Sequence, residues 1–225
     1  MKVSMEDPKK YDYLYEESIK TLRTNLQFSG MDVRTVVFTS CYPNEGKSDI
    51  VLQLAREFGN MGKKVLLLDA DIRKSSYIRR YGVRQAVYGL SQYLSGQVER
   101  ELLYNQTNFE NMDIIFAGPV APNPTELLEG EAFETLLAEA RKRYDYILVD
   151  TPPMMNVIDA AVAAKQCDGA VLVIESELVS YRIAQKVKDQ LQKSGCKILG
   201  AVLNKVDTKR DKYYSSYYSK YAKYY

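Results

Sequence analysis

The stretch "RTVVFTSCYPNEGKSD", residues 34–49, holds the features that decide the fold of this chain. A short β-branched apolar run (34–40) predicts a buried strand, and a turn rich in Pro, Asn and Gly follows it. A helix is expected over 47–60. A turn of this kind between a strand and a helix is typical of a phosphate-binding P-loop, because its backbone N–H groups converge at the helix N-terminus.

The residues of this loop have different expected roles. Lys47 would reach the β- and γ-phosphates, and the Ser48 hydroxyl would ligate Mg²⁺. The strict pattern has a first glycine where this chain has Cys41, so only its second half matches. A surface turn that contains Gly-Lys-Ser by chance is the alternative, and the next two motifs disfavour it. The expected nucleotide-binding residues of the loop are Asn44, Glu45, Gly46, Lys47, Ser48 and Asp49.

Further apolar runs alternate with helical segments along the chain. These runs are continuous, which indicates strands covered on both faces, as in a parallel sheet wrapped by helices. We therefore predict an α/β P-loop NTPase fold, a doubly wound, mainly parallel β-sheet with helices on both faces. The expected strands are 34–40, 63–71, 112–118, 144–153, 169–175 and 197–206, and the expected helices are 11–28, 47–60, 130–143 and 180–194.

Three acidic residues follow two of these predicted strands. "VLLLDAD" ends on Asp69 and Asp71, and "YILVD" ends on Asp150. The carboxyl ends of parallel strands are where open α/β sheets bind ligands, and residues two apart in a strand point to the same side. Either of the first two acids alone could simply cap the next segment. Three acids beside a P-loop instead indicate a magnesium and catalytic site.

Composition excludes several classes of function. The chain has 225 residues, a net charge of +2 and no His, which removes His-based catalysis and His-ligated metal sites. The small net charge gives no reason to expect nucleic acid as a partner. The three Cys residues are far apart in the sequence, as in a reducing compartment. No apolar run is long enough to span a bilayer and no secretory signal is visible, so a cytoplasmic protein is expected.

The motifs together resemble those of a known family. "TSCYPNEGKS", "VLLLDADIRKS" and "YILVDTPP" are similar to the Walker A, A′ and B motifs of bacterial tyrosine kinases. The chain most resembles the free-standing cytoplasmic kinases of Gram-positive capsule and exopolysaccharide operons. The resemblance extends from about Glu17 to the C-terminus. It implies an ATP- and Mg²⁺-dependent protein-tyrosine kinase that regulates polysaccharide synthesis and export.

The resemblance also implies roles for individual residues. Lys47 and Mg²⁺ would act on the γ-phosphate, with Ser48 and Asp150 on the metal. Asp71 would lie in the outer shell of the metal or against Lys47, and Asp69 is the candidate base for the incoming phenol. Asn204, in "VLNKVD", would contact the adenine. Arg73 is a possible charge partner near the A′ motif.

The C-terminal stretch "YYSSYYSKYAKYY" (213–225) resembles the autophosphorylation cluster of the family. A phosphorylated tyrosine gains roughly −1.5 to −2 charges, so a near-neutral tail would become strongly acidic. We expect a kinase domain over 1–206 and a disordered tail over 207–225. An RNA-stacking platform and an aggregation-prone segment are the alternatives for the tail. The expected phosphoacceptors are Tyr213, Tyr214, Tyr217, Tyr218, Tyr221, Tyr224 and Tyr225.

The helix at 11–28 resembles the segment that assembles family members into a ring. Glu17, Lys20 and Arg23 occupy the positions of its E-x-x-R-x-x-R motif, and a solvated face with local ion pairs is the alternative. In a ring, one subunit would phosphorylate the tail of its neighbour. The resemblance further implies a membrane-anchored polysaccharide co-polymerase or adaptor that recruits the kinase to the inner face of the membrane and activates it, and a cognate tyrosine phosphatase.

Several positions depart from the family pattern. Asn44 replaces the usual Gly, and Asn tolerates a left-handed backbone best after Gly. Asp49 replaces the usual Thr and adds a negative charge near the phosphates. These two residues favour a catalytically weak nucleotide-binding regulator as one alternative function. A partition- or division-type ATPase is the other, although its signature Lys is Tyr42 here.

Overall fold

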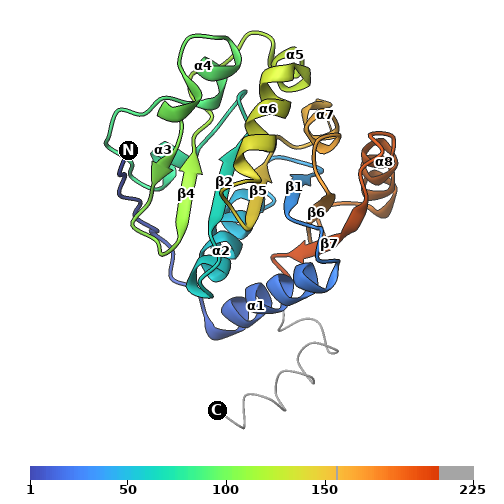
Figure 1. Cartoon of the computed structure of the whole chain (residues 1–225). Coiled ribbons are helices and arrows are strands. Elements are labelled where there is room, and N and C mark those ends of the chain that lie inside the picture. Colours follow the sequence, from blue (N-terminus) through green and yellow to red (C-terminus); the bar gives the residue numbers. More distant parts are fainter. Residues whose placement is uncertain (156, 208–225) are drawn as a thin grey trace.

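The computed structural model describes residues 1–155 and 157–207, which form one layered α/β unit (Figure 1). Its sheet has the order β3-β4-β2-β5-β1-β6-β7, and all neighbours are parallel except β3 and β4. This confirms the predicted mainly parallel α/β sheet. The strands are β1 (Thr35–Ser40), β2 (Val65–Asp69), β3 (Asn105–Gln106), β4 (Met112–Ile115), β5 (Tyr146–Asp150), β6 (Gly169–Glu175) and β7 (Ile198–Asn204).

Helices cover both faces of this sheet, as predicted (Figure 1). The helices α1 and α2 pack against each other on one face, while α5, α6, α7 and α8 lie on the other. The short helices α3 and α4 and the 3-10 turn η1 lie within residues 75–104, where the sequence indicates short helices and loops, whereas α5, α7 and β3 were not predicted. The bounds are α1 (Tyr13–Phe28), α2 (Lys47–Asn60), α3 (Tyr77–Arg80), α4 (Leu90–Leu94), η1 (Arg100–Leu102), α5 (Pro124–Glu129), α6 (Glu131–Ala140), α7 (Asp159–Ala164) and α8 (Tyr181–Gln192).

Successive residues of each central strand contribute to two different hydrophobic cores. In β1, Val36 and Phe38 pack with α1 and α2, whereas Val37 packs with the helices of the other face. All three side chains are almost completely buried. This division explains why the strands read as continuous apolar runs, because both faces of each strand are covered.

Strand register brings the predicted acids together. Asp69 is the pairing partner of Asp150 across β2 and β5, and Asp150 is also in register with Phe38 of β1. The strands β2 and β5 therefore end at one level, and β1 continues two residues further, to Ser40, before the loop that joins it to α2. The position of the site follows from this register, as it does in other open α/β sheets.

The first residues of the chain extend the sheet edge, which the sequence did not indicate. Val3 donates its backbone N–H to Gln106 O, and Gln106 donates to Met1 O, beside β3. Met5 exchanges hydrogen bonds with the side chain of Asn108. The side chains of Val3 and Met5 are buried. The chain then crosses to the N-terminal end of α2, so residues 1–12 connect the sheet edge to the P-loop.

The close approach of α2 to the loop before β4 gives a test of this packing. A Cβ atom at Gly59 would lie 2.1 Å from the Glu110 carbonyl oxygen. Alanine normally favours a helix over glycine by about 1 kcal/mol, but here the clash should lower the free energy of unfolding by about 1–3 kcal/mol. Urea denaturation of Gly59→Ala measures the effect.

A matched control is Gly200→Ala in β7, where a Cβ would meet no atom within 4 Å. It should change stability by less than about 0.5 kcal/mol. A Gly59→Ala protein more stable than the parent would contradict the packing described here.

Candidate functional site

The loop between β1 and α2 has the backbone that a phosphate-binding turn requires. Asn44 has φ 69° and Gly46 has φ 87°, both in the left-handed region. The expectation that Asn44 tolerates this conformation is confirmed. A Cβ at Gly46 would also lie 2.2 Å from the Asn204 side-chain nitrogen, so any other residue there would displace that side chain from the loop.

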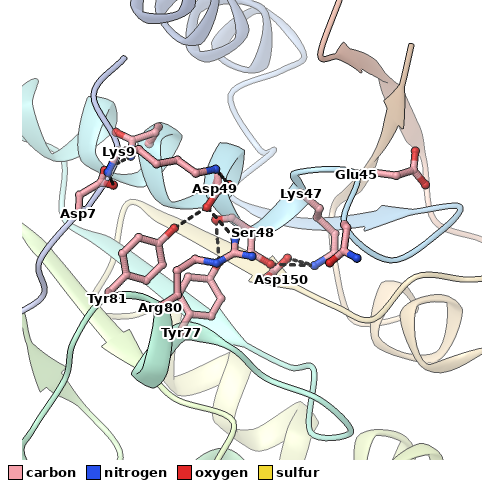
Figure 2. Close-up of polar contacts among 12 residues, drawn as sticks. Asp7, Lys9, Glu45, Lys47, Ser48, Asp49, Tyr77, Arg80, Tyr81 and Asp150 are labelled. Atoms are coloured by element: carbon pink, nitrogen blue, oxygen red, sulfur yellow. Dashed lines mark hydrogen bonds and ion pairs between the residues drawn. The ribbon is translucent and has the colours of Figure 1, made fainter. Parts of the chain in front are cut away.

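The ends of β6 and β7 hold this loop in place. Asn204 Nδ2 donates to the Glu45 carbonyl oxygen at 2.8 Å, and Lys205 Nζ donates to the Asn44 carbonyl oxygen at 2.8 Å. The Glu45 carboxylate accepts from the backbone N–H groups of Tyr42 and Glu175. Figure 2 shows that carboxylate pointing away from Lys47. Glu45 and Asn204 therefore fix the loop in this structure, and the adenine contact of Asn204 stays a prediction.

Lys47 lies between the two residues predicted to hold magnesium. Its ammonium forms a buried ion pair with Asp150 and lies 3.3 Å from Ser48 Oγ (Figure 2). The side chains of Lys47 and Asp150 are only 8% and 1% exposed. Ser48 and Asp150 thus already surround a cation, and their hard oxygen atoms suit Mg²⁺.

The described residues contain no group of three or more His, Cys, Asp or Glu side chains arranged as a metal cage. This agrees with Mg²⁺, which is commonly bound through one or two protein oxygens together with substrate phosphates and water. The residues present therefore fit a nucleotide-bound magnesium ion better than an ion held by the protein alone.

The two acids of the A′ motif occupy different environments. Asp69 is fully buried and accepts hydrogen bonds from Ser75 Oγ and Ala117 N–H. Burial, with the nearby Asp150 carboxylate, raises the pKa of Asp69 to about 8. Asp71 lines the cavity above the loop and accepts from Lys74 N–H. Burial also raises the pKa of Asp71. Of the two, only Asp71 lines the space where an acceptor would enter.

Asp49 is neutralised by three side chains from two other parts of the chain. It forms ion pairs with Lys9 and Arg80 and accepts a hydrogen bond from Tyr81 (Figure 2). Burial alone would raise the pKa of Asp49, but the hydrogen bonds and charges of these three residues lower it. The negative charge that distinguishes this loop is thus balanced within the fold. Asp7 adds to the same junction by accepting from Gln53 and Arg56.

Arg73 is fixed by a buried acid on α7. Its guanidinium binds both oxygens of Asp159, whose side chain has no exposed surface, and also donates to Thr125 Oγ1. This contact fastens the loop after β2 to α5 and α7. Arg73 is therefore held at the edge of the cavity, and its charge partner is Asp159.

Two cavities meet at the P-loop. One, of about 480 Å³, lies above Lys47, Ser48 and Asp71. The other, of about 670 Å³, lies between α1 and the end of β7, where Val202 and Leu203 give it an apolar wall. They share four lining residues, Lys9, Gly46, Asp49 and Lys205. A polar and an apolar compartment joined at a P-loop suit the phosphates and the base of a nucleotide.

Several residues of the site were missed from the sequence. Lys9, Arg80, Tyr81, Lys205 and Asp159 all touch predicted site residues or line the same cavity. The Arg79-Arg80 pair shortly after the A′ motif was the one local signal. The other contacts join segments distant in the sequence, so spacing alone could not reveal them.

The predicted assembly residues on α1 are engaged within the chain. Glu17 and Lys20 form an i,i+3 ion pair at 2.7 Å, and Arg23 binds Glu57 of α2 at 3.1 Å. The Arg23 side chain is only 18% exposed, so it lies against α2 and away from the open face of α1. The seven predicted phosphoacceptors, from Tyr213 to Tyr225, lie outside the described residues.

Fold and loop together define a P-loop nucleotide-binding protein. A family model described as AAA domain matches residues 41–199. The chain is 40% identical to tyrosine-protein kinase CpsD of Streptococcus pneumoniae over 88% of its own length and 87% of the relative. It belongs to the bacterial tyrosine-protein kinases, and is an enzyme of that family.

Solved structures agree with this assignment. The chimerical protein CapA2B2 superposes with TM-score 0.81 at 29% identity, covering 91% of this chain and 93% of the other. The kinase domain of Escherichia coli tyrosine kinase ETK gives 0.80 at 32% identity, covering 87% and 80%. MinD of Pyrococcus horikoshii, solved with Mg-ADP, gives a lower TM-score of 0.68 at 27% identity, covering 79% and 72%.

The contacts of Asp49 predict how its replacement behaves. Asp49→Asn removes the carboxylate charge that pairs with Lys9 and Arg80, so it should lower the free energy of unfolding by about 1–3 kcal/mol. The affinity for Mg-ADP should change by less than about threefold, since the charge is already balanced. Calorimetric titration, with the exposed Asp32→Asn as the matched control, measures this. A rise in affinity of about tenfold would show instead that the Asp49 charge opposes the phosphates.

The raised pKa of Asp69 predicts a pH effect on stability. Between about pH 4 and pH 8 the native protein holds a proton on Asp69 that the unfolded chain does not, so this residue contributes less stability as pH rises through that range. Asp69→Asn should be near neutral at about pH 5 and should stabilise the metal-free protein by about 1–3 kcal/mol at about pH 8. Urea unfolding at both pH values in EDTA tests this.

Asp168 gives the opposite expectation and serves as the control. Burial alone would raise the pKa of Asp168, but Arg141 and two backbone N–H groups lower it. Asp168→Asn should therefore cost stability at about pH 8 and cost less toward about pH 3. The same pH trend in both variants would refute the electrostatic account of Asp69.

Proposed function

We propose that this chain is an ATP-dependent protein-tyrosine kinase that phosphorylates tyrosines of its own C-terminal segment and regulates the synthesis and export of a capsular or extracellular polysaccharide. The observation that carries the proposal is the position of the Lys47 ammonium, which contacts both Ser48 and Asp150 beside Asp71. These groups are suited to a nucleoside triphosphate, and the sequence supplies seven clustered tyrosines to receive its phosphate.

Catalysis in such a site depends on position and charge more than on covalent chemistry. Lys47 would leave Asp150 and bind the β- and γ-phosphates, while Ser48 and Asp150 would hold Mg²⁺ with Asp71 behind them. Bound magnesium would neutralise charge on the phosphates. The phosphate-loop residues Asn44 to Asp49 would enclose the phosphates, and Asn204 would approach the adenine after exchanging its bond to the loop.

The transfer step balances without another reactant. The phenolic oxygen of the acceptor forms a bond to the γ-phosphorus, and the bond from that phosphorus to the bridging oxygen breaks, with its electron pair leaving on ADP. The phenolic proton passes to a carboxylate of the A′ motif. Asp71 is the better placed of the two because it lines the cavity, whereas the raised pKa of Asp69 keeps that buried carboxyl protonated near neutral pH and so unable to accept the phenolic proton.

We further propose that the transfer occurs between subunits of a homo-oligomeric ring. Glu17 and Lys20 are 41% and 43% exposed on α1, so their ion pair is open to a second copy. Arg23 would have to break its ion pair with Glu57 and bind a residue of the second copy before it could take part in this contact. A domain over 1–206 would then act on the segment over 207–225 of its neighbour.

The proposed partners follow from the family. A membrane-anchored adaptor would recruit the kinase to the inner face of the membrane, and a tyrosine phosphatase would reverse its reaction. No helix in the described part of the chain is long and apolar enough to cross a bilayer. The structural relative CapA2B2 is itself a chimera, which supports a partner joined to a kinase of this fold.

A partition- or division-type ATPase is the second candidate, favoured by the superposition on MinD. Its function would involve ATP hydrolysis without phosphotyrosine. The third candidate, a weak nucleotide-binding regulator, rested on Asn44 and Asp49. This candidate loses support because Asn44 has the left-handed backbone that the loop requires, and the charge of Asp49 is neutralised by Lys9 and Arg80.

Intact-mass analysis and peptide mapping after incubation with Mg-ATP test the proposal. The parent protein should carry phosphate on residues 213–225, and Lys47→Met should carry none, because it cannot bind the γ-phosphate. Lys64→Ala, which also removes one positive charge, at an exposed position before β2, should behave like the parent. ATP hydrolysis with an unmodified segment would favour the division-type ATPase.

A mixing experiment separates transfer between subunits from transfer within one. An active variant with all seven tail tyrosines changed to Phe is incubated with Lys47→Met that keeps its tyrosines. Phosphate on the Lys47→Met chain is expected if transfer occurs in trans. No phosphate on the Lys47→Met chain in this mixture, while the parent protein alone modifies its own tail, would contradict the ring mechanism.

A further inference from the structure

The cavity above the P-loop is lined by more basic than acidic side chains. Seven of its lining residues are Lys or Arg and three are Asp or Glu, an excess of four charges, while the whole chain has a net charge of +2. Which of these cations is available to a ligand depends on the carboxylates that pair with each of them.

Most of these cations already have a carboxylate partner. Lys47 pairs with Asp150, Arg73 with Asp159 and Lys205 with Glu175. Lys9 and Arg80 share the single carboxylate of Asp49. These cations are largely balanced by groups within the fold, so they do not explain the excess.

Lys74 and Arg79 have no such partner. Both are exposed, both line the cavity, and neither forms an ion pair with any residue in the ranges 1–155 and 157–207. They lie on the segment that follows the A′ motif. We call this pair, Lys74 and Arg79, the A′ cation pair.

The A′ cation pair is mounted on a rigid support. Tyr77 and Tyr81, on either side of Arg79 in sequence, are each 1% exposed, and the Tyr77 hydroxyl donates to the Ser48 carbonyl oxygen at 3.0 Å. Ser75 Oγ is bonded to Asp69. The backbone that carries the two cations is thus fixed relative to both the phosphate loop and the acidic residues, so a ligand bound there would have to order only the two side chains.

Asp71 connects this pair to the acceptor. Its carboxylate accepts the Lys74 backbone N–H at 2.9 Å, so the candidate base and the first cation belong to one turn. An acceptor tyrosine that reaches Asp71 from the opening must place its neighbouring residues close to the A′ cation pair. The positive charge of the A′ cation pair therefore acts on the residues that flank the acceptor tyrosine.

We propose that the A′ cation pair recognises an anionic group a few residues from the acceptor tyrosine, which makes acidic or already phosphorylated segments the preferred substrates. This rests on the proposed function and names its substrate class. Residues 213–225 contain two Lys and no acid, so they match the pair poorly at first. One phosphotyrosine adds roughly −1.5 to −2 charges, and each phosphorylation then favours the next.

The test uses peptides of residues 211–221 in which Tyr214 is the sole acceptor and the other tyrosines are Phe. Position 217 is Phe, Glu or phosphotyrosine. Their affinities for the Mg-ADP-loaded protein are measured by fluorescence anisotropy, and their KM values by phosphate transfer. The phosphotyrosine peptide should bind about fivefold or more tightly than the Phe peptide at low salt, with Glu intermediate, and the difference should shrink at high salt.

The variant Lys74→Ala/Arg79→Ala should bind all three peptides equally while it keeps the parent affinity for Mg-ADP. The matched control is Lys63→Ala/Lys64→Ala, at the opposite end of β2, which should keep the preference. If only the phosphotyrosine peptide binds more tightly than the Phe peptide, the A′ cation pair recognises phosphorylated segments. If the Glu and phosphotyrosine peptides gain the same affinity over the Phe peptide, the pair recognises acidic segments in general.

Two results would overturn the proposal. Equal affinity of the parent for all peptides would refute it, and the kinase function would stand if the Phe peptide were still phosphorylated. A weaker affinity of the double variant for Mg-ADP, with its peptide preference unchanged, would assign the pair to the nucleotide instead. Absence of any Lys47-dependent transfer, by contrast, would refute the proposed function itself.

Discussion

The buried ion pair between Lys47 and Asp150 is the contact on which the rest of the site depends. It joins the first residue of α2 to the last residue of β5, and both side chains are almost inaccessible to water. A buried charge that loses its partner costs about 3–5 kcal/mol, so each residue constrains the other strongly. The pair therefore fixes the P-loop above the central strands, and it can open only when other charges replace each partner.

The bound nucleotide and its metal are the groups suited to make that exchange. Phosphates can take the Lys47 ammonium, and a divalent cation can take Asp150 and Ser48. The neighbouring Asp69, protonated in the resting site because of burial and the nearby Asp150, adds no further negative charge there until the environment changes. The same residues thus pair with one another in the resting site and provide the ligands for the nucleotide and the metal in the active one.

The sequence predicted the parts of this site that lie within single elements. The strand–loop–helix of residues 35–60 and the acids that end β2 and β5 could be located because local periodicity and parallel topology determine them. The left-handed backbone of Asn44 was also predictable from its type and place. The register that pairs Asp69 with Asp150 was implied only by the assumption that neighbouring strands end together.

Contacts between distant segments could not be predicted in this way. Lys9 and Asp49 are 40 residues apart, and Arg73 and Asp159 are 86 apart. Their pairing depends on how the N-terminal segment crosses α2 and how α7 meets the loop after β2, which no local pattern encodes. For the same reason, Asp49 looked from the sequence like an unbalanced charge, and Arg23 like a residue of the open face of α1.

Binding of ADP with and without Mg²⁺ to the parent and to Asp150→Asn, by calorimetric titration, tests the central claim most directly. If Asp150 holds the metal and restrains Lys47, the parent should bind Mg-ADP about tenfold or more tightly than ADP alone. Asp150→Asn should lose that gain and bind metal-free ADP at least as well as the parent. A variant that keeps the full magnesium gain would contradict the account, because the metal would then be held elsewhere.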